Sequence, residues 1–528
     1  MVTTTISPRL RKDARPEEDA PLILVSNRGP IEHYVDGLGR IRQRDAGGGV
    51  AVALASVARS RPVSWVAAAC SFADQVVALT GRRVPLANGG SLRLVPLPDE
   101  VRAAYYGTFC NPILWFVQHG IPEELSRDVP VDAATAWRSG YAPANRAFAE
   151  AAVEELDRDG GSGRVMLHDY HLYLAPRLIR EARPHTVLQQ FVHIPWPEPF
   201  MWLALPRWLV REICQGLLAN DSIAFQTEDS VGNFLATCRT YLGDEASVIA
   251  QRGEVEYRGH HTSVWSNPIS VDLDELASLR SSPALRTAKA ALANVAGTQT
   301  IVRVDRLDPS KNILRGFQAY DLLLERRPKL RGRVSFLAFL VPSRAGIPEY
   351  DDYTRRVFET VDNVNRKYGT ANWTPITVFY EQNRPQALAG LCLYDVLLVN
   401  SIADGMNLVS KEGPVLNEKN GALVLSVTAG AYQELRGGAI GVDPLDVPAT
   451  ARALEDALQL PPGDRRARAD LLRTGIERHQ LSDWLRHQLK DLAITEYVRG
   501  VGPLARPEPD WQIGPPPMRA ARSLGGVK

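Results

Sequence analysis

The sequence predicts an α/β protein in which two doubly wound domains, each built on a mostly parallel sheet, face each other across a cleft. The first observation is that short apolar runs alternate with longer amphipathic segments in both halves of the chain. The second is the length of 528 residues, which exceeds one ordinary core and favours roughly two to four domains. The third is that the unusual polar residues follow the apolar runs, where ligands of open α/β sheets bind.

The first half contains five short apolar or β-branched runs that predict strands. These runs are PLILVSNR (21–28), VSWVAAA (63–69), RVMLHDY (164–170), TVLQQFVHIP (186–195) and DSIAFQT (221–227). A helical pattern, NRAFAEAAVEELDR, covers residues 145–158 and precedes the third run. We assign residues 21–267 to the first domain.

The second half repeats this alternation and is assigned to a second domain over residues 268–480. Its predicted strands are GTQTIVRVDR (297–306), RVSFLAFLVP (333–342), PITVFYE (375–381), DVLLVNS (395–401) and GALVLSV (421–427), with a helix over 312–328. The boundary is placed at NPISVD, where Pro268 interrupts the pattern. The segment 481–498 predicts a late helix; packing back on the first domain is one arrangement for it, and the sequence does not place it.

Composition and charge indicate a soluble cytoplasmic protein. The net charge of +1 gives no reason to expect a nucleic acid or an anionic membrane as partner. Five scattered cysteines without C-x-x-C spacing argue for reduced thiols and against a zinc site or a disulfide framework. No apolar run reaches the roughly 20 residues of a membrane span. We expect disordered tails at residues 1–20 and 502–528, no cofactor, and leave a homo-oligomer possible.

In the second half, VDRLDPSKN places Arg306 at the end of a predicted strand and Lys311 near the start of the next helix. A guanidinium, an ammonium and helix amides that converge on one anion suit a diphosphate. A solvated basic loop is the alternative interpretation. Arg344 follows another strand in VPSRAG and adds a third cation at the same edge of the sheet.

The stretch ADGMNLVSKEG (403–413) follows a predicted strand and carries more polar groups than a helix start needs. Backbone amides over 406–409 are placed to face a phosphate. Asp404 and Glu412 would be repelled by that phosphate and suit sugar or ribose hydroxyls instead. A diphosphate between two polyols is a nucleotide sugar. Alternatively, Asp404 is only an N-cap and Glu412 only a first-turn acid.

In the first half, VSNRGP places Arg28 at a strand end, and AGGGVAVAL follows with a glycine run that ends at Gly49. Glycines allow a ligand to approach the backbone closely, although G-x-G-x-x-G spacing is lacking. Tyr106 and Trp115 lie in AYYGTFCNPILWF, where plain core aromatics are the alternative interpretation.

Histidines follow the next two predicted strands. HDYHL supplies His168, Asp169 and His171, and VHIPWPEPF supplies His193. A metal site is disfavoured because helical H-x3-H spacing is missing. A histidine before Ile-Pro at a strand end is well placed to contact a substrate, and a structural histidine is the alternative.

Taken in order, the motifs SNR, GGxxV, YY-x8-W, HDYHL, HIPxP, RLD-x2-K, PSR and DGMNLV-x-KE resemble those of trehalose-6-phosphate synthases. The resemblance covers about residues 22–495. It implies a retaining glycosyltransferase of the GT-B architecture, with two Rossmann-like domains. The implied reaction transfers glucose from UDP-glucose or GDP-glucose to glucose 6-phosphate with retention of anomeric configuration. Trehalose made from such a product would serve as a compatible solute in a stress response.

The resemblance also implies roles for individual residues. The groups implied to take part in catalysis are His193, Arg306, Lys311 and Asp404. Those implied to bind the donor are Gly49, Gly405, Met406, Asn407, Leu408, Val409 and Glu412, the last at the ribose. Those implied to bind the acceptor are Arg28, Tyr106 and Arg344 at its phosphate, and Trp115, Asp169 and His171 at its sugar. No carboxylate nucleophile is assigned in this family; the leaving phosphate oxygen deprotonates the acceptor hydroxyl on the same face.

The sequence departs from the family pattern at several places. Pro309 and Asn312 stand in the donor loop where tyrosine and glycine are frequent, and Ala403 stands where arginine is frequent. Trp137 and Tyr141 are separated by one residue more than expected. These departures leave the nucleotide base open. The alternatives are a glucosylglycerol-phosphate synthase, a pseudo-glycosyltransferase that joins cyclitols, and a non-catalytic sugar-phosphate sensor.

Overall fold

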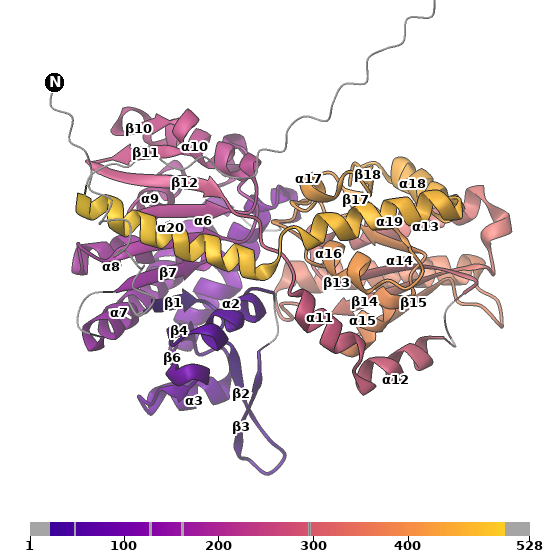
Figure 1. Ribbon diagram of the computed structural model, residues 1–528, viewed down its shortest axis with the longest axis horizontal. Coiled ribbons are helices and arrows are strands. Elements are labelled where there is room, and N and C mark those ends of the chain that lie inside the picture. Colours follow the sequence, from indigo (N-terminus) through magenta and orange to yellow (C-terminus); the bar gives the residue numbers. More distant parts are fainter. Residues whose placement is uncertain are drawn as a thin grey trace, which may run out of the picture.

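The computed structural model describes residues 22–46, 49–125, 129–159, 163–293, 295 and 297–501. Figure 1 shows two α/β bodies side by side, the first in indigo to magenta and the second in orange. The last helix, in yellow, runs back along the first body. The predicted tails at 1–20 and 502–528 lie outside the described residues. No helix in the described ranges is long and apolar enough to cross a membrane.

The first body is built on a ten-stranded sheet in the order β10-β11-β12-β9-β8-β7-β1-β4-β6-β5. Its central strands pair in parallel and are β1 (Leu22–Ser26), β4 (Ser64–Ala68), β6 (Ser91–Val95), β7 (Arg164–His168), β8 (Val187–Val192), β9 (Ser222–Phe225) and β12 (His260–Ser266). Antiparallel strands close the edges: β5 (Val84–Pro85), β10 (Ala246–Ile249) and β11 (Glu254–Tyr257). The five strands predicted for this half are all present.

The second body is built on a six-stranded parallel sheet in the order β15-β14-β13-β16-β17-β18. Its strands are β13 (Gln299–Arg306), β14 (Val334–Val341), β15 (Ile376–Tyr380), β16 (Val396–Val399), β17 (Ala422–Ser426) and β18 (Ile440–Val442). β16 and β17 are buried along their whole length, as expected for strands covered on both faces. The five strands predicted here are present, and β18 is an addition.

Strand order reverses next to β1 in the first sheet and next to β13 in the second. β4 and β6 follow on one side of β1 while β7, β8 and β9 follow on the other; β14 and β15 likewise diverge from β16 and β17. The two loops that leave neighbouring strands at such a reversal diverge and open a crevice at their carboxyl ends. Arg28, Asp169 and Asp404 follow strands at these two reversals, and Arg306 is the last residue of β13.

Helices cover both sheets. Those of the first body are α2 (Gly49–Ser60), α3 (Phe72–Leu79), α4 (Asp99–Arg102), α5 (Trp115–Gln118), α6 (Val129–Ala136), α7 (Ala142–Arg158), α8 (Ala175–Ala182), α9 (Arg207–Leu217) and α10 (Glu228–Leu242). Those that follow are α11 (Leu273–Arg280), α12 (Pro283–Leu292), α13 (Ile313–Arg326), α14 (Pro348–Tyr368), α15 (Arg384–Leu393), α16 (Val409–Leu416), α17 (Tyr432–Leu435), α18 (Val447–Gln459), α19 (Pro462–Glu477) and α20 (Leu481–Val501). A small hairpin, β2 (Ile31–Val35) and β3 (Ile41–Asp45), projects at the foot of the first body in Figure 1.

The late helix α20 packs on the first sheet, against β8 and β9. Its Trp484 is buried, lies 5.3 Å from the ring of Phe191 and accepts a hydrogen bond at its carbonyl from Asn267 at 3.4 Å. Leu481 N donates to Val271 O at 3.2 Å, so the start of this helix is fixed to the segment that joins the two bodies. The helix packs back on the first body because this arrangement buries the apolar ring of Trp484.

The extra residue between Trp137 and Tyr141 is absorbed by a π-helical turn, η4 (Trp137–Tyr141). Such a turn accommodates one additional residue within a helix. Both aromatic rings stay buried, 5.0 Å apart and stacked, and Phe109 packs on Tyr141 at 4.6 Å. This departure from the family pattern therefore leaves the aromatic core intact.

Candidate active site

The loop after β13 is held by side-chain hydrogen bonds to its own backbone and to the next strand. Asn312 has a φ of 56°, a left-handed conformation that asparagine tolerates and that glycine would adopt freely. Its Nδ2 donates to Asn400 O at 2.9 Å and to Pro444 O at 2.7 Å, while Asn400 Nδ2 donates to Asn312 O at 3.1 Å. Asn312, which stands where glycine is frequent, therefore adopts the same left-handed turn. Its hydrogen bonds with Asn400 attach that turn to the end of β16.

Lys311 and Asp404, 93 residues apart in the chain, form a direct ion pair between Nζ and Oδ2. Ser401 Oγ and Asn407 Nδ2 donate to the same carboxylate oxygen at 3.2 and 3.0 Å. Although burial disfavours its charged form, the Lys311 charge and these donors lower the pKa of Asp404. Asp404 is therefore an ionised carboxylate held in one orientation beside the predicted diphosphate lysine.

The stretch that follows Asp404 differs in detail from the predicted helix start. The helix α16 begins at Val409, so residues 406–408 precede it, and the placement of the whole 406–409 stretch at the helix N-terminus was wrong. Asn407 Oδ1 accepts from Ser410 N at 3.1 Å, so Asn407 provides the side-chain cap. The interpretation of Asp404 as a simple N-cap is therefore wrong as well.

Gly405 lies where the two bodies touch. A Cβ atom at this position would come within 1.8 Å of His193 O, which belongs to the first body. Behind it, a Cβ on Gly430 would come within 1.8 Å of Gly405 O. Only glycine permits this close backbone approach on both sides.

Lys411 and Glu412 face different surroundings. Lys411 is fully buried, and its Nζ donates to Ile269 O at 2.9 Å and to the Glu434 carboxylate at 2.9 to 3.0 Å. Burial raises the pKa of the half-buried Glu412, an effect that the nearby Arg384 opposes. Lys411 is thus a structural ion-pair partner that anchors the segment between the bodies, whereas Glu412 lies in the first turn of α16, as the alternative interpretation also expects.

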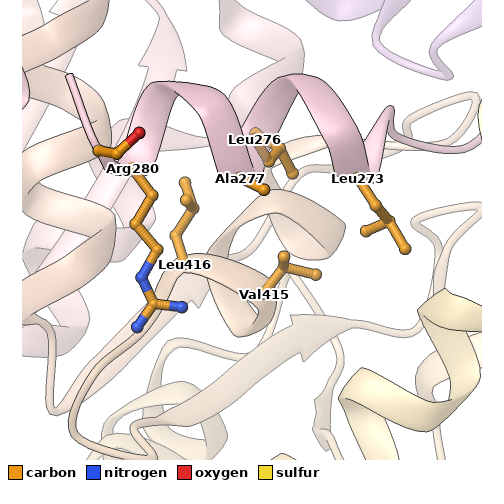
Figure 2. A pocket seen from close by; sticks show the side chains of 7 residues that line it. Leu273, Leu276, Ala277, Arg280, Val415 and Leu416 are labelled. Atoms are coloured by element: carbon orange, nitrogen blue, oxygen red, sulfur yellow. The ribbon is translucent and has the colours of Figure 1, made fainter.

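A small apolar hollow of about 270 Å³ lies between α11 and α16. Figure 2 shows Leu273, Leu276 and Ala277 from α11 facing Val415 and Leu416, with Arg280 at one side. Val415 and Leu416 lie one helical turn after Glu412 on α16, so the hollow adjoins that carboxylate on the side of α11.

Trp115 joins the two bodies at the other side of the crevice. Its Nε1 donates to Asp308 Oδ1 at 3.1 Å, and the guanidinium carbons of Arg306 and Arg344 lie 5.1 and 4.0 Å from its ring centroid. Both distances are those of cation–π contacts. An acceptor residue predicted in the first half and two cations predicted in the second are thus in direct contact.

Asp308 is a site residue that sequence reasoning missed, although it stands inside the RLD-x2-K motif. Besides Trp115, it accepts from Ser310 N at 3.0 Å, from Ser310 Oγ at 2.8 Å and from Arg344 Nη1. The charges of Arg344 and Arg306 lower its pKa to about 2 despite complete burial. This carboxylate therefore ties the donor loop to the Trp115–Arg344 cluster.

Tyr106 and His171 stack in parallel, with ring centroids 6.1 Å apart and planes inclined by 8°. The ring nitrogens of His171 are buried and have no hydrogen-bond partner among the described residues. Burial, with the charges of Arg344 and Arg28, lowers the pKa of His171 well below its usual value, so the imidazole is neutral. A buried polar ring without a partner costs free energy unless a ligand meets it, which fits an acceptor contact.

Asp169 is held in a strained backbone conformation, with a φ of 74°. Its amide donates to Phe191 O at 2.7 Å, and its Oδ1 accepts from His193 N at 3.3 Å. Burial raises its pKa to about 7. Asp169 and His193, which follow two successive strands, are thus brought together.

Arg28 and Arg344 reach this region from opposite bodies. Arg28 is exposed after β1, whereas the side chain of Arg344 is buried and donates to Tyr350 OH at 2.6 Å. Gly49 is the first residue of α2. Within the described ranges, no cluster of three or more His, Cys, Asp or Glu side chains is arranged to hold a metal ion.

These elements define a class of protein: two Rossmann-like bodies meet at the carboxyl ends of their strands, with a cationic loop and a glycine-bearing turn facing an aromatic and imidazole cluster. That is the arrangement of GT-B glycosyltransferases, and the chain has this fold. The chain belongs to glycosyltransferase family 20, whose family model matches residues 21–494.

The chain is similar to several relatives that are named as trehalose-phosphate synthases. It is 31% identical over 480 residues to the UDP-forming α,α-trehalose-phosphate synthase of Schizosaccharomyces pombe, with 88% of each chain covered. It is 30% identical over 469 residues to synthase A of Dictyostelium discoideum. The matched region covers 88% of this chain and 61% of the relative. The chain thus spans about three fifths of the length of that relative and of a Thermoproteus tenax bifunctional synthase/phosphatase, of which it covers 62%.

Solved structures agree with the fold. A UDP-forming synthase from Burkholderia xenovorans in complex with glucose-6-phosphate matches with a TM-score of 0.75 and 28% identity, covering 89% of this chain and 99% of that one. An E. coli structure bound with UDP-2-fluoro glucose matches with a TM-score of 0.76 and 26% identity, covering 90% and 99%.

Proposed function

We propose that this protein transfers glucose from a nucleotide-glucose to glucose 6-phosphate, with retention at the anomeric carbon, and so forms trehalose 6-phosphate. The observation that carries the proposal is the contact of Trp115 with Arg306, Asp308 and Arg344, which sets the donor loop against the acceptor cluster. Relatives named as UDP-forming trehalose-phosphate synthases support it.

In this proposal the second body, 268–480, binds the nucleotide sugar. Arg306 and Lys311 hold the diphosphate and stabilise the negative charge that grows on it as the glycosidic bond breaks. Asp404 and the backbone of 405–407 hold the glucose hydroxyls, the amides of Leu408 and Val409 face the diphosphate, and Glu412 holds the ribose.

The first body, 21–267, binds the acceptor. Arg28 and Tyr106, with Arg344 from the second body, hold the phosphate of glucose 6-phosphate, a dianion that guanidinium groups bind well. Trp115, Asp169 and His171 orient the sugar. Gly49 lies against the donor, and His193 makes a hydrogen bond to the transferred glucose.

Retention follows from transfer on one face of the sugar. A double displacement needs a free carboxylate beside the anomeric carbon. Asp404, the acid proposed to hold the glucose, is already engaged by Lys311, Ser401 and Asn407. The departing phosphate oxygen then takes the proton of the attacking hydroxyl, while Arg306 and Lys311 hold that phosphate in place.

The test is a panel of UDP-, GDP- and ADP-glucose against glucose 6-phosphate and glycerol 3-phosphate, with the products identified by mass spectrometry and NMR. We expect trehalose 6-phosphate and release of nucleoside diphosphate. Transfer to glycerol 3-phosphate alone would favour a glucosylglycerol-phosphate synthase, and binding without release of nucleoside diphosphate would favour a sensor. A cytoplasmic location, a role in stress tolerance and a homo-oligomer remain predictions.

A further inference from the structure

A pair of histidine rings lies beneath the crevice, at the ends of two adjacent strands. His168 is the last residue of β7 and His193 follows β8, and Nδ1 of His168 lies 3.2 Å from Nε2 of His193. His168 is fully buried, whereas His193 retains 9% of its surface. The ring nitrogen of His193 that does not face His168, Nδ1, is therefore the one available to a ligand. His168 has no part in the reaction proposed above.

Both rings are neutral. Burial lowers the pKa of His168 to about 3 and that of His193 well below its usual value. A neutral imidazole carries one N–H and one lone pair, so the shared hydrogen bond has two possible directions. If His168 donates, Nδ1 of His193 carries a hydrogen; if His193 donates, Nδ1 of His193 is a bare lone pair.

The surroundings of His168 favour the first direction. Its Nε2 is buried and has no hydrogen-bond partner in the part of the chain that the structure describes, and the same holds for the indole Nε1 of Trp484, whose ring lies 6.5 Å away on α20. An indole nitrogen can only donate. If His193 donated, the Nε2 of His168 would carry a second buried N–H without an acceptor beside that of Trp484. Buried N–H groups without an acceptor are rare in native proteins.

If His168 donates instead, its Nε2 is an acceptor in a region that supplies donors. Trp484 offers its N–H, and the fully buried Gln488, one helical turn further along α20, has an amide nitrogen and an amide oxygen that both lack a partner among the described residues. Because the amide of Gln488 supplies a donor and an acceptor alike, the indole of Trp484, which can only donate, decides the balance. A lone pair among donors is the cheaper of the two arrangements, because it leaves one unpaired donor fewer.

We propose that His168 is a positioning residue that donates from Nδ1 to His193 Nε2 and so makes His193 Nδ1 a hydrogen-bond donor to an oxygen of the transferred sugar. The inference rests on the proposed contact of His193 with the sugar. The inference adds the direction of that hydrogen bond. The sugar oxygen accepts from His193, and the hydrogen of that sugar hydroxyl points to another group. His193 touches the substrate and His168 does not. The role of His168 is to fix the tautomer of His193.

Two substitutions of His168 separate this role from packing. His168→Asn keeps an N–H donor close to the position of Nδ1, whereas His168→Leu fills similar space and donates nothing. We expect kcat/KM to stay within about threefold in His168→Asn and to fall about 10- to 100-fold in His168→Leu, the loss typical of one oriented hydrogen bond. Thermal unfolding of both variants reports whether either has lost its fold.

The tautomer itself is read by two-bond 1H–15N correlation spectra of the histidine-labelled protein without substrate, with His193 assigned from its His193→Gln variant. We expect a hydrogen on Nδ1 of His193 in the wild type and in His168→Asn, and a mixture of tautomers in His168→Leu. A hydrogen on Nε2 of His193 in the wild type, or equal activity of the two variants, would overturn the inference. Since the spectra need no turnover, an inactive wild type would count against the proposed reaction and not against the tautomer.

Discussion

The close approach of the backbone at Gly405 to that at His193 leads to a sharp prediction. A Cβ on Gly405 would lie 1.8 Å from His193 O, and contacts below 3.0 Å are essentially never made by real Cβ atoms. In Gly405→Ala the two backbones must therefore separate by at least 3.0 − 1.8 = 1.2 Å. Such a shift would displace the backbone of 405–407 from the proposed glucose and the amides of Leu408 and Val409 from the proposed diphosphate.

The segment around Gly405 cannot escape this strain by moving the other way. Gly430 N donates to Asp404 O at 3.0 Å and Ala431 N donates to Met406 O at 2.9 Å, so the next loop holds it from behind. A misplacement of about 1 Å at a reacting centre costs about 100-fold in rate. We expect a fall in kcat of about that size, with a loss of about 1–3 kcal/mol in the free energy of unfolding from overpacking.

The assay is steady-state release of nucleoside diphosphate, with glucose 6-phosphate and the preferred nucleotide-glucose both saturating. The matched control is Gly437→Ala, because a Cβ on the exposed Gly437 meets nothing within 4 Å. The control should keep wild-type activity and stability. If Gly405→Ala keeps kcat within twofold of wild type, the closed contact between the bodies plays no part in catalysis and the reasoning fails.

Three further predictions concern single side chains. Arg306→Ala should lower kcat by about 100-fold or more with a much smaller change in donor affinity, because the cation acts on charge that develops as the bond breaks; steady-state kinetics and direct titration with the nucleotide-glucose separate the two effects. Lys411→Met should cost about 3–5 kcal/mol in urea unfolding, since it leaves the Glu434 carboxylate without its buried partner, and Lys411→Met with Glu434→Gln should recover much of that loss. Burial raises the pKa of Asp169 to about 7 from 3.8, so the folded protein holds a proton that the unfolded chain releases, and stability should fall as pH rises from about 4 to 7. Asp169→Asn should remove this fall, which is on the order of 4 kcal/mol at most, as measured by urea unfolding at pH 5 and pH 8.

Continuous apolar runs predicted β1, β4, β7, β8 and β9 correctly, because these strands are buried along their whole length and carry mostly apolar residues. β6 was not predicted: its residues alternate between half-buried and buried positions, and Arg93 interrupts the run. β10, β11 and β12 were missed for a similar reason, since they form an antiparallel edge with polar side chains such as Glu254 and His261. Partly exposed strands give a weaker signal than buried ones.

The candidate site was predictable at the level of strand ends and not at the level of contacts. Sequence reasoning assigned Lys311 to a diphosphate and Asp404 to a sugar, and the structure pairs the two side chains directly. Asp308 was overlooked because an acid in a basic loop gives no sign of its partners. These partners are Arg344, in the loop that follows β14, and Trp115 in the other body. Long-range pairing of this kind depends on the fold and leaves no periodic trace in the sequence.

The central claim is a retaining glucosyl transfer in which the leaving phosphate oxygen accepts the proton. The most direct test is the 1H NMR spectrum of the disaccharide phosphate made from a nucleotide α-glucose and glucose 6-phosphate. The account predicts α configuration at both anomeric carbons and one nucleoside diphosphate released for each disaccharide formed. A β linkage at the transferred glucose, or release of free glucose without a disaccharide, would contradict it.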